Sequence, residues 1–149
     1  MYIYSRFSID KGFLWIADRV AVTVPLCGAF IRIGNFFNSE IYGKPTDGTW
    51  GVIFKSIDNI PRHPTQFYEA FAYFLMFLAL GYVYLYKKSW VAKPGFLMGL
   101  FFVLCFGFRF GIEFFKANQV GFEAGMALNM GQILSIPAVL FGLIFMFRR

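Results

Sequence analysis

Residues 20–43 read VAVTVPLCGAFIRIGNFFNSEIYG, an apolar run that ends in a dense group of hydrogen-bonding side chains. The first half is typical of a helix in lipid, whereas the second half holds an arginine, two asparagines and a glutamate within nine positions. A charged side chain inside a membrane span costs about 2.5–3.5 kcal/mol on insertion scales, so it usually faces a protein interior or a wet cavity. The stretch therefore predicts a membrane helix with a polar site at one end.

The composition of the whole chain also indicates a membrane protein. Of its 149 residues, 58% are hydrophobic and only 15% are charged, and the mean hydropathy is +0.60. A soluble domain is about 45–50% apolar and about 25% charged. Because one small core cannot bury this much apolar surface, we expect a single integral-membrane domain over residues 1–149, of the all-α class.

Four apolar runs are long enough to cross a bilayer, which requires about 20 residues. Their approximate bounds are 13–37, 66–86, 94–115 and 130–147. The first run carries three charged residues, of which we interpret Asp18 and Arg19 as a pair near the inner surface. A longer, turn-rich segment over residues 41–65 joins the first two runs, and its GVIF stretch is consistent with a short strand.

The basic residues predict the orientation of these spans. Seven lie in residues 1–11, 87–93 and 148–149, and four lie in residues 41–65 and 116–129. Because the richer side is usually cytoplasmic, we expect both termini inside and the long segment outside. The basic residues form no continuous stripe, so the net charge of +6 predicts contact with anionic membrane lipid and not with nucleic acid.

Charged side chains of two distant spans fall near the same outer membrane depth. Arg109 and Glu113, four residues apart in FRFGIEFF, share one helical face. We expect Arg32 and Arg109 to hold an anionic head group, most simply a phosphate. Glu40 and Glu113 would orient the arginines or take protons. The alternative is an ordinary intrahelical pair in the third span, with Arg32 extending to the interface.

Weaker candidates lie nearby. His63, the only histidine, precedes a proline, and both a structural and a catalytic role are open. Asn35 and Asn38 are typical of side chains that bond main chain at a helix end and tolerate left-handed backbone. Gly43 permits close approach of another group to the backbone. The two cysteines have no metal-type spacing, so we predict no metal site.

Four motifs, RIGNFFNSEIYGKPTDGTWGVIF, RHPTQFYEA, FRFGIEFF and NMGQILSIP, cover much of the chain. In this order they resemble the bacterial prolipoprotein diacylglyceryl transferase family. The resemblance implies a multi-pass enzyme of the cell inner membrane with its active site towards the periplasmic leaflet. Such an enzyme moves the diacylglyceryl group of phosphatidylglycerol onto the lipobox cysteine thiol of a prelipoprotein peptide. Glycerol phosphate leaves, and no cofactor is implied.

The family's motif residues map onto this sequence one by one. By resemblance, the catalytic candidates are Asn35, Glu40 and Glu113, and the residues that bind the lipid phosphate are Arg32, Arg109 and Gly43. His63 and Asn38 are secondary candidates from the residues alone, and His63 does not take the place of the family's upstream histidine. One departure is Ile31, where most family members have glycine.

A larger departure is that no segment here resembles the family's upstream spans, which carry a tyrosine and a histidine. The chain thus resembles the C-terminal portion of the enzyme, and we expect little transfer by this portion alone. Two other functions stay open. One is a non-catalytic lipid-binding or assembly subunit that keeps the head-group site. The other is a small transporter, because charge within spans also marks ion paths.

Overall fold

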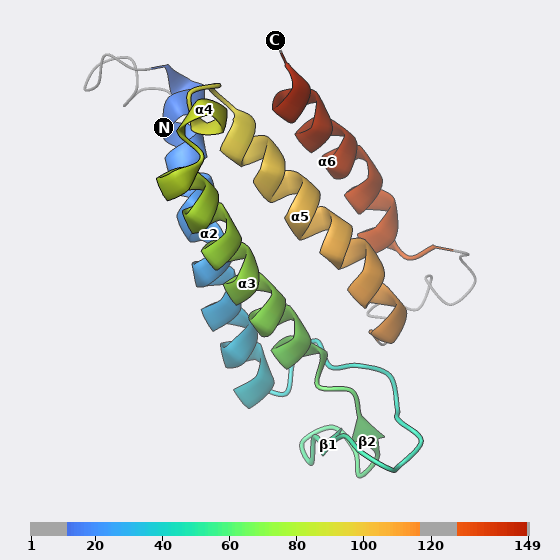
Figure 1. Ribbon diagram of the computed structural model, residues 1–149. Helices are drawn as coiled ribbons and strands as arrows, with labels where there is room; N and C mark the ends of the chain where they lie inside the picture. The colour runs from blue at the N-terminus through green and yellow to red at the C-terminus, as the bar shows by residue number, and fades with distance from the viewer. Residues whose placement is uncertain (1–11, 117–127, 149) are drawn as a thin grey trace.

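The computed structural model describes residues 12–116 and 128–148. The elements in chain order are α2 (Phe13–Phe37), β1 (Val52–Ile53), β2 (Pro61–Arg62), α3 (Thr65–Tyr86), α4 (Lys88–Val91), α5 (Phe96–Ile112), the 3-10 helix η1 (Glu113–Phe115) and α6 (Met130–Phe147). Helix α2 lies beside α3, and α5 lies beside α6 (Figure 1). We call the end where α2 ends and α3 begins the loop end, and the opposite end the terminal end.

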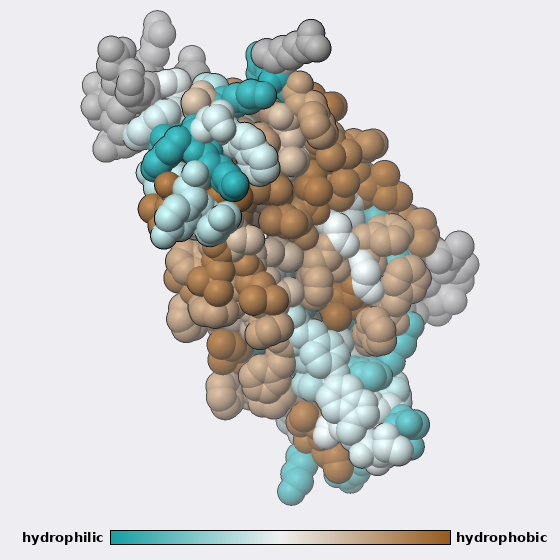
Figure 2. All heavy atoms as spheres, in the orientation of Figure 1, coloured by the Kyte–Doolittle hydropathy of each residue, from teal (hydrophilic) through white to brown (hydrophobic). Residues whose placement is uncertain are grey.

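In the described part of the chain, four helical segments are long and apolar enough to cross a membrane: α2, α3, α5 continued by η1, and α6. This confirms the predicted all-α fold with four candidate spans. Figure 2 shows hydrophobic side chains over the middle of one face and hydrophilic side chains at both ends. Large apolar residues such as Phe30, Phe71 and Ile144 are exposed, as expected of side chains that contact lipid.

A buried carboxylate of α2 binds the first turn of α5. Asp18 of α2 is fully buried and accepts hydrogen bonds from the backbone N–H of Gly95 (2.8 Å) and of Met98 (2.9 Å). These are donors that the first turn of a helix leaves unpaired, and the helix dipole favours a negative charge there. The interpretation of Asp18 and Arg19 as a pair at the inner surface is therefore wrong. Arg19 instead donates to the Trp15 carbonyl at 3.0 Å and lies over the Trp15 ring.

The segment between α2 and α3 is fixed to the end of α5. The strand expected in GVIF is present as β1, which pairs with β2 in antiparallel register. Lys44 donates its backbone N–H to the Phe115 carbonyl (2.9 Å) and its ammonium to the Phe114 carbonyl (3.0 Å).

Near β2, hydrogen bonds from the Arg62 side chain lower the pKa of Asp58 below its ordinary value.

Two glycines allow α5 and α6 to pack closely. A Cβ atom on Gly99 would lie 2.6 Å from the Gly142 carbonyl oxygen, and a Cβ atom on Gly142 would lie 2.6 Å from that of Gly99. Small residues are common at helix contacts within membranes because they let two backbones approach. The pair therefore sets the separation of the two helices, and a side chain at either position would force them apart.

We predict opposite effects for two glycine-to-alanine substitutions. Gly142→Ala should lower the free energy of unfolding by about 1–3 kcal/mol, the usual cost of overpacking. Gly107→Ala on α5 meets no atom within 4 Å and should raise it by about 1 kcal/mol, because alanine favours helix. Titration with sodium dodecyl sulfate in mixed micelles, followed by circular dichroism, measures both values. Equal effects of the two substitutions would contradict the close glycine contact.

Candidate functional site

Five charged side chains form a continuous series of ion pairs at the loop end. Arg32 Nε lies 3.1 Å from Glu69 Oε2, and Lys116 Nζ lies 2.9 Å from Glu69 Oε1. The same Lys116 Nζ lies 3.6 Å from Glu113 Oε1, and Arg109 Nη2 lies 3.8 Å from that oxygen. We call these five residues the charge network. It joins α2 and α3 to the end of α5.

The carboxylates and the ammonium of the charge network are buried, and its arginines are more exposed. The side chains of Glu69, Lys116 and Glu113 are 0%, 2% and 6% exposed, whereas those of Arg32 and Arg109 are 13% and 36% exposed. Three positive and two negative groups leave an excess of one positive charge. An uncompensated charge is costly in a low-dielectric site, and a nearby anion would offset this excess.

Hydrogen bonds to the main chain fix the α2–α3 side of the network. The Gln66 side-chain amide donates to the Glu40 carbonyl at 2.7 Å, and the Thr65 hydroxyl donates to the Ile41 carbonyl at 3.2 Å. Ser39 and Ile41 adopt left-handed backbone with φ of 56° and 53°, which turns the chain sharply after α2. These contacts place Glu69, one turn into α3, opposite Arg32.

The start of α6 fixes the Glu113 side of the network. Asn129 caps this helix through a capping box with Gln132, and its side-chain amide also donates to Glu113 Oε2 at 3.3 Å. A Cβ atom on Gly131 would collide with the Glu113 carboxylate, so only glycine permits this approach. The late motif NMGQILSIP therefore supports the carboxylate that binds Arg109 and Lys116.

The structure brings together Arg32, Arg109 and Glu113, as predicted, but through two other residues. The simpler alternative for Arg32 is wrong, because its guanidinium pairs with a buried carboxylate and does not extend to the interface. Glu69 and Lys116 were not among the predicted site residues. Glu69 lies inside the second predicted span and Lys116 directly follows the third, so a search for every charge inside or directly beside a span would find both.

Three other predicted residues lie beside the network without joining it. Glu40 is exposed and forms no ion pair with any described residue; its carbonyl accepts the Gln66 amide. Asn35 is half-buried and Asn38 is exposed, and the side chain of neither has a hydrogen bond within residues 12–116 and 128–148. Backbone bonds close the end of α2 instead, and Asn38 has a φ of −80°. The prediction that asparagine side chains close this helix end is therefore wrong.

Gly43 and His63 belong to one tight backbone contact. The Gly43 N–H donates to the His63 carbonyl at 3.0 Å, and a Cβ atom at Gly43 would lie 2.5 Å from that oxygen. This gives Gly43 a packing role, and its head-group role stays a prediction. The His63 ring lies near Trp50, with its Nδ1 3.4 Å from the Tyr68 hydroxyl oxygen.

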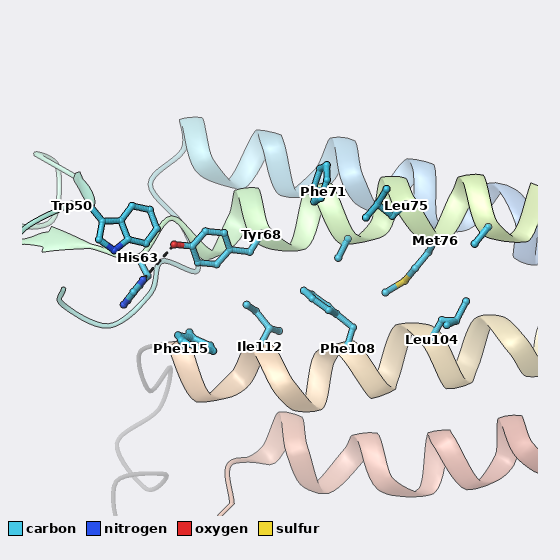
Figure 3. A pocket seen from close by; sticks show the side chains of 12 residues that line it. Trp50, His63, Tyr68, Phe71, Leu75, Met76, Leu104, Phe108, Ile112 and Phe115 are labelled. Atoms are coloured by element: carbon cyan, nitrogen blue, oxygen red, sulfur yellow. Dashed lines mark hydrogen bonds between the residues drawn. The ribbon is translucent and has the colours of Figure 1, made fainter. Parts of the chain in front are cut away.

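An apolar groove of about 770 Å³ opens between α3 and α5. Side chains from the two helices face each other across it, with Trp50, His63 and Tyr68 near its loop end (Figure 3). The residues deeper in the groove, among them Met76 and Leu104, are apolar. Tyr68 and Ile112 line the groove and directly precede Glu69 and Glu113 in the sequence. The loop end of the groove and the charge network therefore lie at the same height along α3 and α5.

The arrangement of these motifs agrees with comparisons to known proteins. The model of the prolipoprotein diacylglyceryl transferase family matches residues 1–148. The chain belongs to this family. A phosphatidylglycerol–prolipoprotein diacylglyceryl transferase of Tolumonas auensis is 48% identical over 98% of the chain and 56% of the relative. Proteins of the same name from Bacteroides fragilis and Chloroherpeton thalassium are 47% and 42% identical over 99% of the chain.

The chain spans about half the length of these curated relatives, between 52% and 56% of each. The family resemblance seen in the sequence is thereby confirmed.

We predict that loss of the buried carboxylate destabilises the fold. Glu69→Gln leaves Arg32 and Lys116 without their shared partner, and breaking a buried pair costs about 3–5 kcal/mol. The matched control Glu40→Gln changes an exposed glutamate and should stay within about 0.5 kcal/mol. The same detergent titration measures both. A Glu69→Gln value as small as that of the control would show that the pairs contribute nothing to stability.

Proposed function

We propose that this chain binds phosphatidylglycerol and acts in the transfer of its diacylglyceryl group to the lipobox cysteine thiol of a prelipoprotein. The observation that carries the proposal is the positively charged network with its two partly exposed arginines, which lies at the same end of the helices as the aromatic mouth of an apolar groove. A phospholipid is complementary to both parts, because its anionic head suits the arginines and its apolar chains suit the groove. The named relatives act on these substrates, which supports the assignment.

The head group would lie against Arg32 and Arg109. A guanidinium group presents N–H donors in a planar fork that matches phosphate oxygens. Each arginine already has a carboxylate partner, Glu69 for Arg32 and Glu113 for Arg109, so its side chain is oriented before lipid arrives. Preorganised donors at a dry site stabilise the charge that grows on a departing phosphate.

The transfer forms one bond and breaks one. The thiolate sulfur attacks the glycerol carbon that carries the phosphate ester, a carbon–sulfur bond forms, and the carbon–oxygen bond to the phosphate breaks. The phosphate oxygen keeps the bonding electron pair, so glycerol phosphate leaves as an anion. The thiol proton must pass to a base first, because the thiolate is the nucleophile.

Glu40 is the base that we propose within this chain. Its carboxylate is exposed and unpaired among the described residues, whereas that of Glu113 is occupied by Lys116, Arg109 and Asn129. Glu113 then serves as the carboxylate that orients Arg109. His63 is the second candidate base. Asn35 stays a catalytic candidate and Gly43 a candidate head-group contact by family resemblance, and Asn38 stays a secondary candidate without a helix-end role.

The apolar groove would hold an acyl chain. It runs between two spans, its deep lining is apolar, and its loop end has the aromatic residues Trp50 and Tyr68, which are typical of a membrane interface. The basic-residue bias of the connecting segments supports a position of this end at the periplasmic leaflet of the inner membrane. A phospholipid of that leaflet would then reach the network with its head and the groove with a tail.

The head-group assignment predicts that each arginine contributes to lipid affinity. Arg32→Ala and Arg109→Ala should each weaken phosphatidylglycerol binding about tenfold, because a hydrogen bond to a charged group contributes about 1.5–3 kcal/mol. Native mass spectrometry of the purified chain, with phosphatidylcholine as competitor, measures the affinity. Arg148→Ala, at the terminal end, is the control and should leave the affinity unchanged. Unchanged binding in both arginine variants would remove the phosphate role.

Transfer of labelled diacylglycerol to a lipobox peptide tests the chemical step separately. We expect little transfer by the chain alone, and Glu40→Gln should abolish what remains. Binding that depends on Arg32 and Arg109, with no transfer under any condition, would favour the non-catalytic lipid-binding subunit.

The groove assignment predicts a selective loss of long-chain lipid. Leu104→Trp should fill the groove and weaken binding of long-chain phosphatidylglycerol about tenfold, since each buried CH₂ group contributes about 0.8 kcal/mol. It should not change the affinity for glycerol phosphate, which has no tail. Leu134→Trp, on an exposed face of α6, is the matched control. Equal effects of the two tryptophans would show that the groove does not hold the lipid.

A further inference from the structure

We propose that Lys116 is a positioning residue that couples Arg32 to Arg109, so that the two arginines bind the anionic head group as one unit. This rests on the proposed function of the charge network and adds a residue that links its two halves. In this proposal Lys116 does not touch the lipid. Its side chain is buried, and its ammonium contacts the two glutamates.

The contacts of the network divide into two halves. One half is Arg32 with Glu69, from α2 and α3, and the other is Arg109 with Glu113, from α5 and η1. Within the described residues, the Lys116 ammonium is the one charged group that contacts both glutamates, at 2.9 Å and 3.6 Å. Each glutamate contacts an arginine as well. If either glutamate moves, the Lys116 ammonium moves with it. The ammonium then shifts the other glutamate and the arginine paired with that glutamate.

Lys116 is held at both its side chain and its backbone. Its side chain is 2% exposed, and a lysine is almost never buried so deeply unless it is paired. Its backbone forms an isolated β-bridge with Gly43. The neighbouring Lys44 binds the carbonyls of Phe114 and Phe115. The backbone of Lys116 is therefore held in place, and the position of its ammonium determines the positions of both carboxylates.

The chemistry of lysine suits this link. An ammonium is a compact charge with three donors, so it can bind two carboxylates that approach from different helices. Without it, Glu69 and Glu113 would be two buried anions that repel each other and lose a shared cation. Each arginine would then follow only its own glutamate. The expected consequence is that the arginines act independently on a bound head group once Lys116 is neutral.

A double-mutant cycle tests this coupling. Phosphatidylglycerol affinity is measured by native mass spectrometry for the native chain, Arg32→Ala, Arg109→Ala and the double variant, and again with Lys116→Met in each. In the native background, we expect the combined loss to be at least about fivefold smaller than the product of the single losses. With Lys116→Met, the losses should multiply within about twofold. Lys116→Arg, which keeps the charge and several donors, should restore the coupling.

Two controls separate this role from simple support of the fold. Lys55→Met removes an exposed ammonium of the segment between α2 and α3 that belongs to no ion pair among the described residues, and it should leave the coupling intact. If Lys116→Met loses its helical circular dichroism signal, Lys116→Gln, which stays polar, takes its place. A cycle unchanged by the neutral Lys116 variant overturns this proposal and leaves the proposed function standing. Absence of phosphatidylglycerol binding by the native chain would instead overturn the proposed function, and the coupling with it.

Discussion

The pairing of the Glu69 carboxylate with Arg32 and Lys116 is the interaction on which the loop end depends. Glu69 is fully buried, and in a membrane no water is available to replace a lost partner. Its two ion pairs connect the α2–α3 pair to the end of α5. Among the described residues, the network holds three basic and two acidic side chains, an excess of one positive charge. The proposed anionic head group would offset this excess.

The rest of the molecule serves to hold that network in place. At the terminal end, Asp18 binds the first turn of α5. Along the helices, Gly99 and Gly142 bring α5 and α6 into close contact, and at the loop end Gly131 admits the Glu113 carboxylate. Asp18 is costly within a span, whereas the three glycines permit close approach of a neighbouring backbone or side chain. Together these contacts hold the helices in place relative to one another. The helix backbones that carry the network residues are therefore positioned by packing.

The sequence predicted the spans and part of the site. Length and hydropathy were sufficient for the four helices, because a span needs a long apolar run whatever its neighbours are. The spacing of Arg109 and Glu113 was sufficient for their contact, because residues four apart share a helical face. The partners of Arg32 and Asp18 could not be predicted, since they come from helices distant in sequence. Lys116 was misjudged because a lysine just after an apolar run is usually solvated, and here the loop before α3 covers it.

The central claim is that Arg32 and Arg109 contact one lipid phosphate. Solid-state NMR can measure it directly, through the dipolar coupling between arginine side-chain nitrogens and lipid phosphorus in phosphatidylglycerol bilayers. Difference spectra of Arg32→Lys and Arg109→Lys against the native chain assign the contacts. The account predicts that the native chain has guanidinium nitrogen signals that are weakened by coupling to lipid phosphorus. Each substitution should remove one of these signals. Signals that stay unchanged in both variants would contradict it.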